Sequence, residues 1–117
     1  MAQPPNESPN APTILVVDDT PTNLSVLVGI LQGSGYRILA ARNGRAALEI
    51  ARRTQPDLML LDVAMPGMNG FDVCRELRLD PAASETIVIF LSALGDVSDK
   101  VSGLELGAAD YIKAISE

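Results

Sequence analysis

Short apolar runs recur along the chain and alternate with segments of helical periodicity. The apolar runs cover residues 13–17, 36–40, 58–61, 86–91 and 109–112. Runs of this length are typical of strands that are buried on both faces, as in a parallel sheet. Between them, apolar positions recur at helical spacing over residues 23–32, 44–55, 71–79 and 97–106. The order is β-α repeated four times and then β, which predicts an α/β fold with a parallel sheet and helices on both of its faces.

The first twelve residues, MAQPPNESPNAP, have a different character from the rest of the chain. They contain four prolines and no large aliphatic residue after the initiator methionine. Such a composition cannot bury enough apolar surface to offset the cost of ordering the chain. We therefore expect residues 1–12 to be a disordered leader and residues 13–117 to form one domain.

The composition excludes several classes of function. Nine basic and fifteen acidic residues give a net charge of −6 and a pI near 4.5, which argues against a nucleic-acid or anionic-membrane surface. The chain has one cysteine and no histidine, so it lacks the residues for a disulfide framework, a Cys/His zinc site or Ser-His catalysis. No apolar run approaches the roughly 18 residues of a membrane span. We expect a soluble, cytoplasmic domain.

Polar groups follow four of the predicted strands. Asp18 and Asp19 come after the first strand, Asp62 after the third, Ser92 after the fourth and Lys113 after the fifth. In open α/β sheets, ligands bind in the crevice outside the carboxyl ends of the strands. Each residue alone has a simpler interpretation: the acidic pair as a helix cap, Asp62 and Ser92 as turn residues, and the lysine as a solvated charge. Together at strand ends, they favour a functional site.

Three carboxylates in one crevice repel one another. Two charges 4 Å apart cost on the order of 4 kcal/mol at an effective dielectric constant near 20. Such a cluster requires shifted pKa values, a bound cation, or both. Ligands that are all oxygen point to a hard ion, and Mg²⁺ fits a site with few carboxylates.

These residues resemble the receiver domains of two-component response regulators, over Thr13 to about Ile115. The motifs that carry the resemblance are ILVVDD at 14–19, LMLLDVAMPGMNG at 58–70, IVIFLSA at 87–93 and GAADYI at 107–112. The resemblance implies a flavodoxin-like, doubly wound five-stranded sheet with the strand order 2-1-3-4-5.

The resemblance also implies the chemistry of the site. Asp62 resembles the phosphoacceptor of the family, and the donor would be a phosphohistidine on a sensor histidine kinase or a histidine phosphotransfer protein. Mg²⁺ would be held by Asp19, Asp62 and the backbone carbonyl of Ala64, with Asp18 acting through a water. Beyond this self-catalysed transfer and slow autodephosphorylation, we expect no enzymatic activity.

The resemblance implies a switch as well. Ser92 would bind the new phosphoryl group, and Tyr111 would change rotamer and alter the surface of the fourth helix and fifth strand, through which the domain could form a homodimer. The alternative for Tyr111 is a surface aromatic on an edge strand. Ala64 and Leu94 stand where family members line the path of the hydrolytic water. Neither side chain can orient water, which predicts a long-lived phosphoryl group.

The sequence departs from the family at its C-terminal end. The family usually has two residues and then Lys-Pro after the Asp-Tyr pair, whereas here Lys113 comes one residue early and is followed by Ala114. An ungapped alignment leaves the site without its lysine, because a one-residue slip turns a strand side chain to the opposite face. A one-residue deletion before Lys113 keeps the lysine and is the alignment we prefer. The loss of the proline would remove the family's cis peptide.

The chain stops where the family has a fifth helix. We therefore expect a truncated N-terminal domain, with an output domain beyond Glu117. The missing helix would leave an apolar flank on the sheet, which favours association with a partner.

The main alternative function is a degenerate receiver that binds partners without phosphate. An aspartate-nucleophile phosphatase would need an acid at Ala64, and a flavin carrier would need a phosphate loop in place of Asp18 and Asp19.

Overall fold

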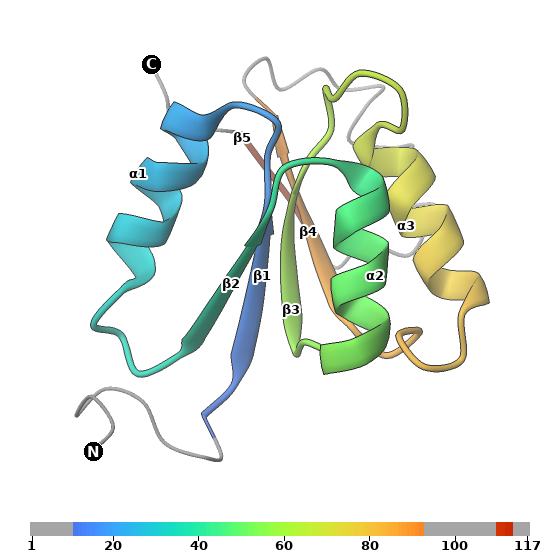
Figure 1. Cartoon of the computed structure of the whole chain (residues 1–117), viewed down its shortest axis with the longest axis horizontal. Coiled ribbons are helices and arrows are strands. Elements are labelled where there is room, and N and C mark those ends of the chain that lie inside the picture. The colour runs from blue at the N-terminus through green and yellow to red at the C-terminus, as the bar shows by residue number, and fades with distance from the viewer. Residues whose placement is uncertain (1–10, 93–109, 114–117) are drawn as a thin grey trace.

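The fold is a five-stranded parallel sheet with helices on both faces (Figure 1). A computed structural model describes residues 11–92 and 110–113 of the chain. The strands are β1 (Thr13–Val17), β2 (Arg37–Ala41), β3 (Leu58–Asp62), β4 (Ile87–Ser92) and β5 (Asp110–Lys113), and the helices are α1 (Pro21–Leu31), α2 (Gly44–Thr54) and α3 (Gly70–Leu79). The strand order β2-β1-β3-β4-β5 confirms the predicted fold class and topology.

The predicted boundaries differ from the observed ones by one or two residues. Helix α1 begins at Pro21, two residues before the apolar periodicity of residues 23–32, because proline suits the first helical position, as its place in the sequence predicts. Strand β2 begins at Arg37, whose backbone N–H donates to the carbonyl of Pro12 at 2.9 Å. Strand β5 extends to Lys113, which the sequence placed just beyond the strand. The predicted fourth helix and residues 1–10 of the leader lie outside the described residues.

The two faces of the sheet form two separate apolar layers. Leu15, Met59 and Val88 are neighbours across β1, β3 and β4, and all three are fully buried in the layer that packs against α2 and α3. The opposite face contributes Ile14 and Val16, which pack with Leu24 of α1. Figure 1 shows α1 on one side of the sheet and α2 and α3 on the other. Burial on both faces explains why the strands read as continuous apolar runs.

Hydrogen bonds at the N-terminal edge of the sheet fix the register of the three central strands. The Asp57 carboxylate accepts the Thr13 N–H at 2.8 Å, and the Thr13 carbonyl accepts the Asp57 N–H at 2.9 Å. The Asp57 carbonyl accepts the N–H of Ile87 at 3.1 Å. Because register decides which residues stand at the far ends of the strands, these bonds align the carboxyl ends of β1, β3 and β4.

The described helices are short. Each contains 10 or 11 residues, so none in residues 11–92 is long enough to cross a membrane.

Candidate functional site

Three carboxylates gather at the carboxyl ends of β1 and β3. Oxygens of Asp18, Asp19 and Asp62 lie within 4.8 Å of one another. The register explains this approach: Val17 pairs with Leu61, so the residues that follow each of them emerge side by side. Asp18 is buried, whereas Asp19 and Asp62 are half-buried. The predicted acidic cluster is therefore present, and two of its members face outwards far enough to meet a ligand.

Backbone contacts orient the carboxylate of Asp18. Asp18 donates its N–H to the carbonyl of Ala41 at 3.2 Å, and its carboxylate accepts the N–H of Thr20 at 2.9 Å. The N-cap of α1 is Thr20, which makes no side-chain cap bond. The acidic pair therefore does not provide the N-cap residue of α1. The sequence signal for this Asx turn is an aspartate two residues before Thr20.

Asp62 is both a turn residue and a member of the cluster. Its carboxylate accepts the N–H of Ala64 at 3.2 Å, as the simpler interpretation of an aspartate before a loop requires. Partial burial, followed by the nearby charges of Asp18 and Asp19, raises the pKa of Asp62 from 3.8 to about 7, against the opposing effect of the Ala64 N–H. A group with so unfavourable a charge has a strong tendency to take up a proton or a cation.

The donor set fits Mg²⁺. The three side chains offer only carboxylate oxygens, which are the ligands of a hard ion that retains several waters. Among residues 11–92, the ion pairs are Arg52–Asp80 and Arg75–Asp72, so no arginine in that range pairs with the cluster. The ligand roles expected of Asp19, Asp62 and the backbone carbonyl of Ala64 stay predictions.

A tight loop connects Asp62 to α3. The N–H of Val63 donates to the carbonyl of Leu91 on β4 at 3.3 Å, and the Val63 carbonyl accepts the N–H of Gly70 at 3.0 Å. Gly67 has a φ of 80°, a left-handed conformation that favours glycine. Asn69 and Asp72 form a capping box that begins α3. The loop is thus held at both ends, on β4 and on the helix.

The register places Ser92 and Lys113 at the same edge of the sheet as the cluster. Asp62 pairs with Leu91, the residue before Ser92, and Ser92 pairs with Lys113. The side chains of Ser92, Tyr111 and Lys113 lie outside the described part of the structure, as does the whole of Leu94. The roles expected of these four residues therefore stay predictions.

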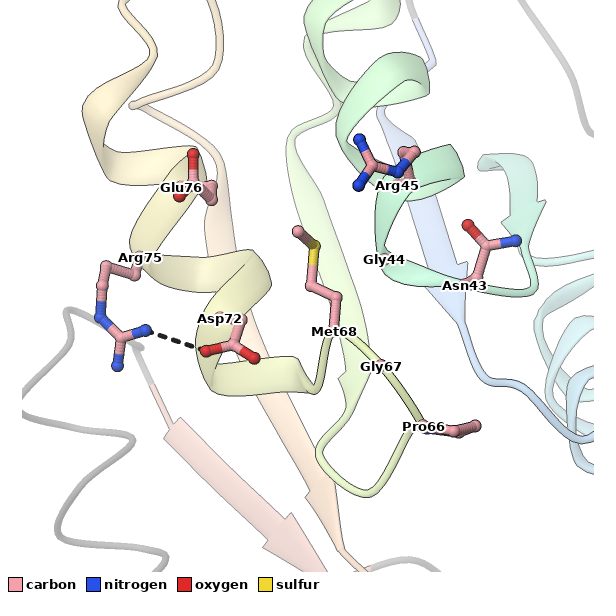
Figure 2. A pocket seen from close by; sticks show the side chains of 9 residues that line it. All are labelled: Asn43, Gly44, Arg45, Pro66, Gly67, Met68, Asp72, Arg75 and Glu76. Atoms are coloured by element: carbon pink, nitrogen blue, oxygen red, sulfur yellow. Dashed lines mark hydrogen bonds and ion pairs between the residues drawn. The ribbon is translucent and has the colours of Figure 1, made fainter.

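A separate pocket lies between the start of α2 and the start of α3 (Figure 2). Its lining includes Asn43, Gly44, Arg45, Met68, Asp72 and Arg75. Some of its polar side chains stabilise the ends of the two helices. Asn43 caps α2, and the Asp72 carboxylate accepts hydrogen bonds from the Asn69 N–H and from Arg75. No member of the carboxylate cluster lines this pocket, so it is distinct from the candidate site.

Replacing Asp62 by asparagine is expected to stabilise the metal-free domain at about pH 8. The folded pKa of about 7 exceeds the ordinary value of 3.8, so ionisation of Asp62 costs stability as the pH rises from about 4 to 7, and the full cost is present above pH 7. For a half-exposed group, we expect a gain on the order of 1–2 kcal/mol after allowance for solvent screening.

Urea unfolding of both proteins in EDTA, at about pH 8 and about pH 5, measures this effect. Most of the difference should disappear at the lower pH, because the native protein is then protonated at Asp62. Equal stability of the two proteins at about pH 8 would show that the ionised Asp62 carboxylate does not destabilise the metal-free domain.

Comparisons with known proteins agree with this geometry. The family described as "Response regulator receiver domain" matches residues 14–115. The response regulator PleD of Caulobacter vibrioides is 44% identical over 99 residues, which are 85% of this chain and 22% of PleD. The chemotaxis protein CheY4 of Vibrio cholerae has a similar structure, with a TM-score of 0.85 and 27% identity over 92% of this chain and 89% of that one.

A third similar structure contains a magnesium ion. The receiver domain of the sensor histidine kinase PA1611 from Pseudomonas aeruginosa, solved with a magnesium ion coordinated in its active-site cleft, gives a TM-score of 0.81 at 29% identity over 92% of this chain and 88% of that one. The chain spans about a fifth of the length of PleD. The family match covers nearly the whole chain and the fold agrees throughout the described residues, so the chain belongs to the response regulator receiver domains.

Proposed function

We propose that this domain accepts a phosphoryl group on Asp62 from a phosphohistidine of a partner protein, with Mg²⁺ bound beside it. The observation that carries the proposal is the cluster of Asp18, Asp19 and Asp62, whose oxygens lie within 4.8 Å of one another. Burial of Asp62, followed by the charges of its two acidic neighbours, raises the pKa of Asp62 to about 7. Perturbed pKa values produced by burial and like charges are a mark of functional sites.

The transfer needs an ionised Asp62 in line with the phosphorus atom. One carboxylate oxygen forms a P–O bond while the P–N bond to the donor imidazole breaks, and the electron pair stays on the imidazole nitrogen. In the metal-free site, burial and the charges of Asp18 and Asp19 raise the pKa of Asp62 to about 7. Bound Mg²⁺ would offset this cost and keep the Asp62 carboxylate ionised for attack. The bond to the Ala64 N–H keeps one carboxylate oxygen oriented.

The proposed metal ligands are Asp19, Asp62 and the carbonyl of Ala64, with Asp18 acting through a water. Bound Mg²⁺ supplies charge neutralisation for the carboxylates and for the phosphoryl oxygens. Burial of Asp18 suits the indirect role, because Asp19 and Asp62 are the more exposed members of the cluster.

The phosphoryl donor is proposed to lie outside this domain. Residues 1–117 contain no histidine, so the phosphohistidine would be supplied by a sensor histidine kinase or a histidine phosphotransfer protein. We further propose a cytoplasmic location and an output domain elsewhere in the full protein. A homodimer through the fourth helix and β5 stays a prediction.

We also propose that the phosphoryl group on Asp62 is long-lived, because the exposed side chain of Ala64 cannot orient a water molecule for hydrolysis.

A degenerate receiver that works without phosphate is the second candidate. The observation in its favour is the position of Lys113, one residue nearer to Tyr111 than the family pattern has it. If that lysine points away from the cluster, transfer would lose a positive charge that neutralises the phosphoryl group.

Intact-mass spectrometry after incubation with acetyl phosphate and Mg²⁺ tests the proposal. We expect a gain of about 80 Da that does not appear when EDTA is present and that hydroxylamine, which cleaves acyl phosphates, removes. No gain under saturating conditions would favour the degenerate receiver. A gain that resists hydroxylamine would place the phosphoryl group on a hydroxyl instead of a carboxylate.

A further inference from the structure

Gly70, the first residue of α3, lies directly against the backbone of the proposed phosphoacceptor. A Cβ atom at this position would stand 2.5 Å from the carbonyl oxygen of Asp62 and 2.9 Å from the Cα of Val63. Both distances are shorter than carbon tolerates, and both partners are backbone atoms of the strand end. Figure 1 shows the start of α3 reached from the loop that leaves β3.

The same glycine is hydrogen-bonded to the strand it touches. Its N–H donates to the carbonyl of Val63 at 3.0 Å, and Val63 in turn donates its N–H to Leu91 of β4 at 3.3 Å. The backbone that carries Asp62 is therefore held between β4 on one side and the start of α3 on the other. Without a side chain at position 70, the helix can approach close enough to make this bond.

Gly44 provides a matched comparison. It is also the first residue of a helix, it is also buried, and its helix also has an asparagine N-cap. A Cβ atom at Gly44 would meet the side chains of Met68 and Val73 at 2.8 Å, but no backbone atom of Asp62 is among its nearest neighbours. Figure 2 shows Gly44 with Met68 beside the separate pocket. Side chains can turn aside, whereas a strand end that carries the site cannot.

We infer that Gly70 is a positioning residue for Asp62: its missing side chain lets α3 pack against β3 in the one arrangement that holds the Asp62 carboxylate in place for phosphoryl transfer. The inference rests on the proposed function. A Cβ atom at position 70 would force the start of α3 and the backbone of Asp62 and Val63 apart by a large part of an ångström. A misplacement of about 1 Å at a reacting group can reduce a rate about 100-fold.

The test compares Gly70→Ala, Gly44→Ala and Gly29→Ala with the native protein. Gly29 lies inside α1, where a Cβ atom meets nothing within 4 Å, so this variant controls for the change in helix propensity. For each protein, the rate of phosphoryl uptake is measured against acetyl phosphate concentration at saturating Mg²⁺. Urea unfolding gives the stability, and amide NMR signals report the backbone of residues 62–64.

We expect Gly70→Ala to lower the maximal uptake rate about 10- to 100-fold, with little change in the acetyl phosphate concentration at half-maximal rate. The amide signals of residues 62–64 should shift in this variant. Gly44→Ala and Gly29→Ala should keep the native rate to within about threefold, even if Gly44→Ala loses as much stability.

Three results would overturn the inference. The first is a native uptake rate in Gly70→Ala, and the second is an equal loss of rate in Gly44→Ala. The third is a Gly70→Ala chain that fails to fold while Gly44→Ala folds, because the glycine would then be required for the stability of the whole domain and not for the position of Asp62. If the native protein takes up no phosphoryl group, the proposed function fails. The amide signals then decide the positioning: a shift at residues 62–64 in Gly70→Ala alone supports it, and unchanged signals reject it.

Discussion

Asp62→Asn is expected to abolish phosphoryl uptake from acetyl phosphate. A carboxamide oxygen is a poor nucleophile and cannot form a stable acyl phosphate, and the substitution also removes one proposed metal ligand. The gain of about 80 Da seen by intact-mass spectrometry should therefore be absent even after long incubation with saturating Mg²⁺. In rate terms, we expect a loss of at least about 1,000-fold.

Asp72→Asn is the matched control. Asp72 lies ten positions further along the chain in the first turn of α3, where an amide oxygen can still accept the N–H of Asn69. Its uptake rate should stay within about twofold of the native rate. Because Asp62→Asn is also expected to be more stable than the native protein at about pH 8, its loss of uptake could not be ascribed to unfolding. A full mass gain in Asp62→Asn would move the acceptor to Asp18 or Asp19, and fragmentation would show which.

The sheet and the acidic cluster could be predicted because both depend on local patterns. Strands buried on both faces are continuous apolar runs, and the parallel order brings their carboxyl ends to one edge. Asp18, Asp19 and Asp62 each follow such a run directly, so their positions in the sequence placed them together. The structure confirms this meeting of the three carboxylates.

Other features depend on contacts that a single sequence does not encode locally. The role inferred for Gly70 comes from a close approach of α3 to the backbone of Asp62, and a glycine before a helix has many simpler explanations. The start of β2 is set by the bond from Arg37 to Pro12, a residue that the composition assigned to the leader. In both cases, tertiary contacts decide what local propensity leaves open.

The position of Lys113 was left open by the sequence for a related reason. A one-residue difference in a strand reverses the direction of a side chain. Nothing in the local pattern reveals whether the chain has lost a residue before Lys113 or aligns without a gap, which would leave the site without its lysine. The backbone register pairs Lys113 with Ser92 at the edge where the carboxylates gather. Which alignment is correct stays a prediction, because the side chain of Lys113 lies outside the described part of the structure.

Lys113→Met is accordingly expected to slow phosphoryl uptake about 100-fold or more, at unchanged Mg²⁺ concentration. A cation aimed at the charge that develops in transfer is worth this much in comparable sites. The chain has two lysines, and Lys100→Met is the control that removes the same charge elsewhere in the sequence. Its uptake rate should stay within about twofold of the native rate.

An insertion separates the two alignments more directly. One alanine placed between Ile112 and Lys113 restores the family spacing. If the lysine already reaches the site, as the deletion alignment has it, the insertion turns it away and uptake should fall about as far as in Lys113→Met. If the ungapped alignment is correct, the inserted chain should take up phosphate faster than the native one, and Lys113→Met should have no effect. That second pair of results would identify the native domain as one whose site has the carboxylates for phosphorylation but lacks its lysine, and would make interaction without phosphate its better-supported function.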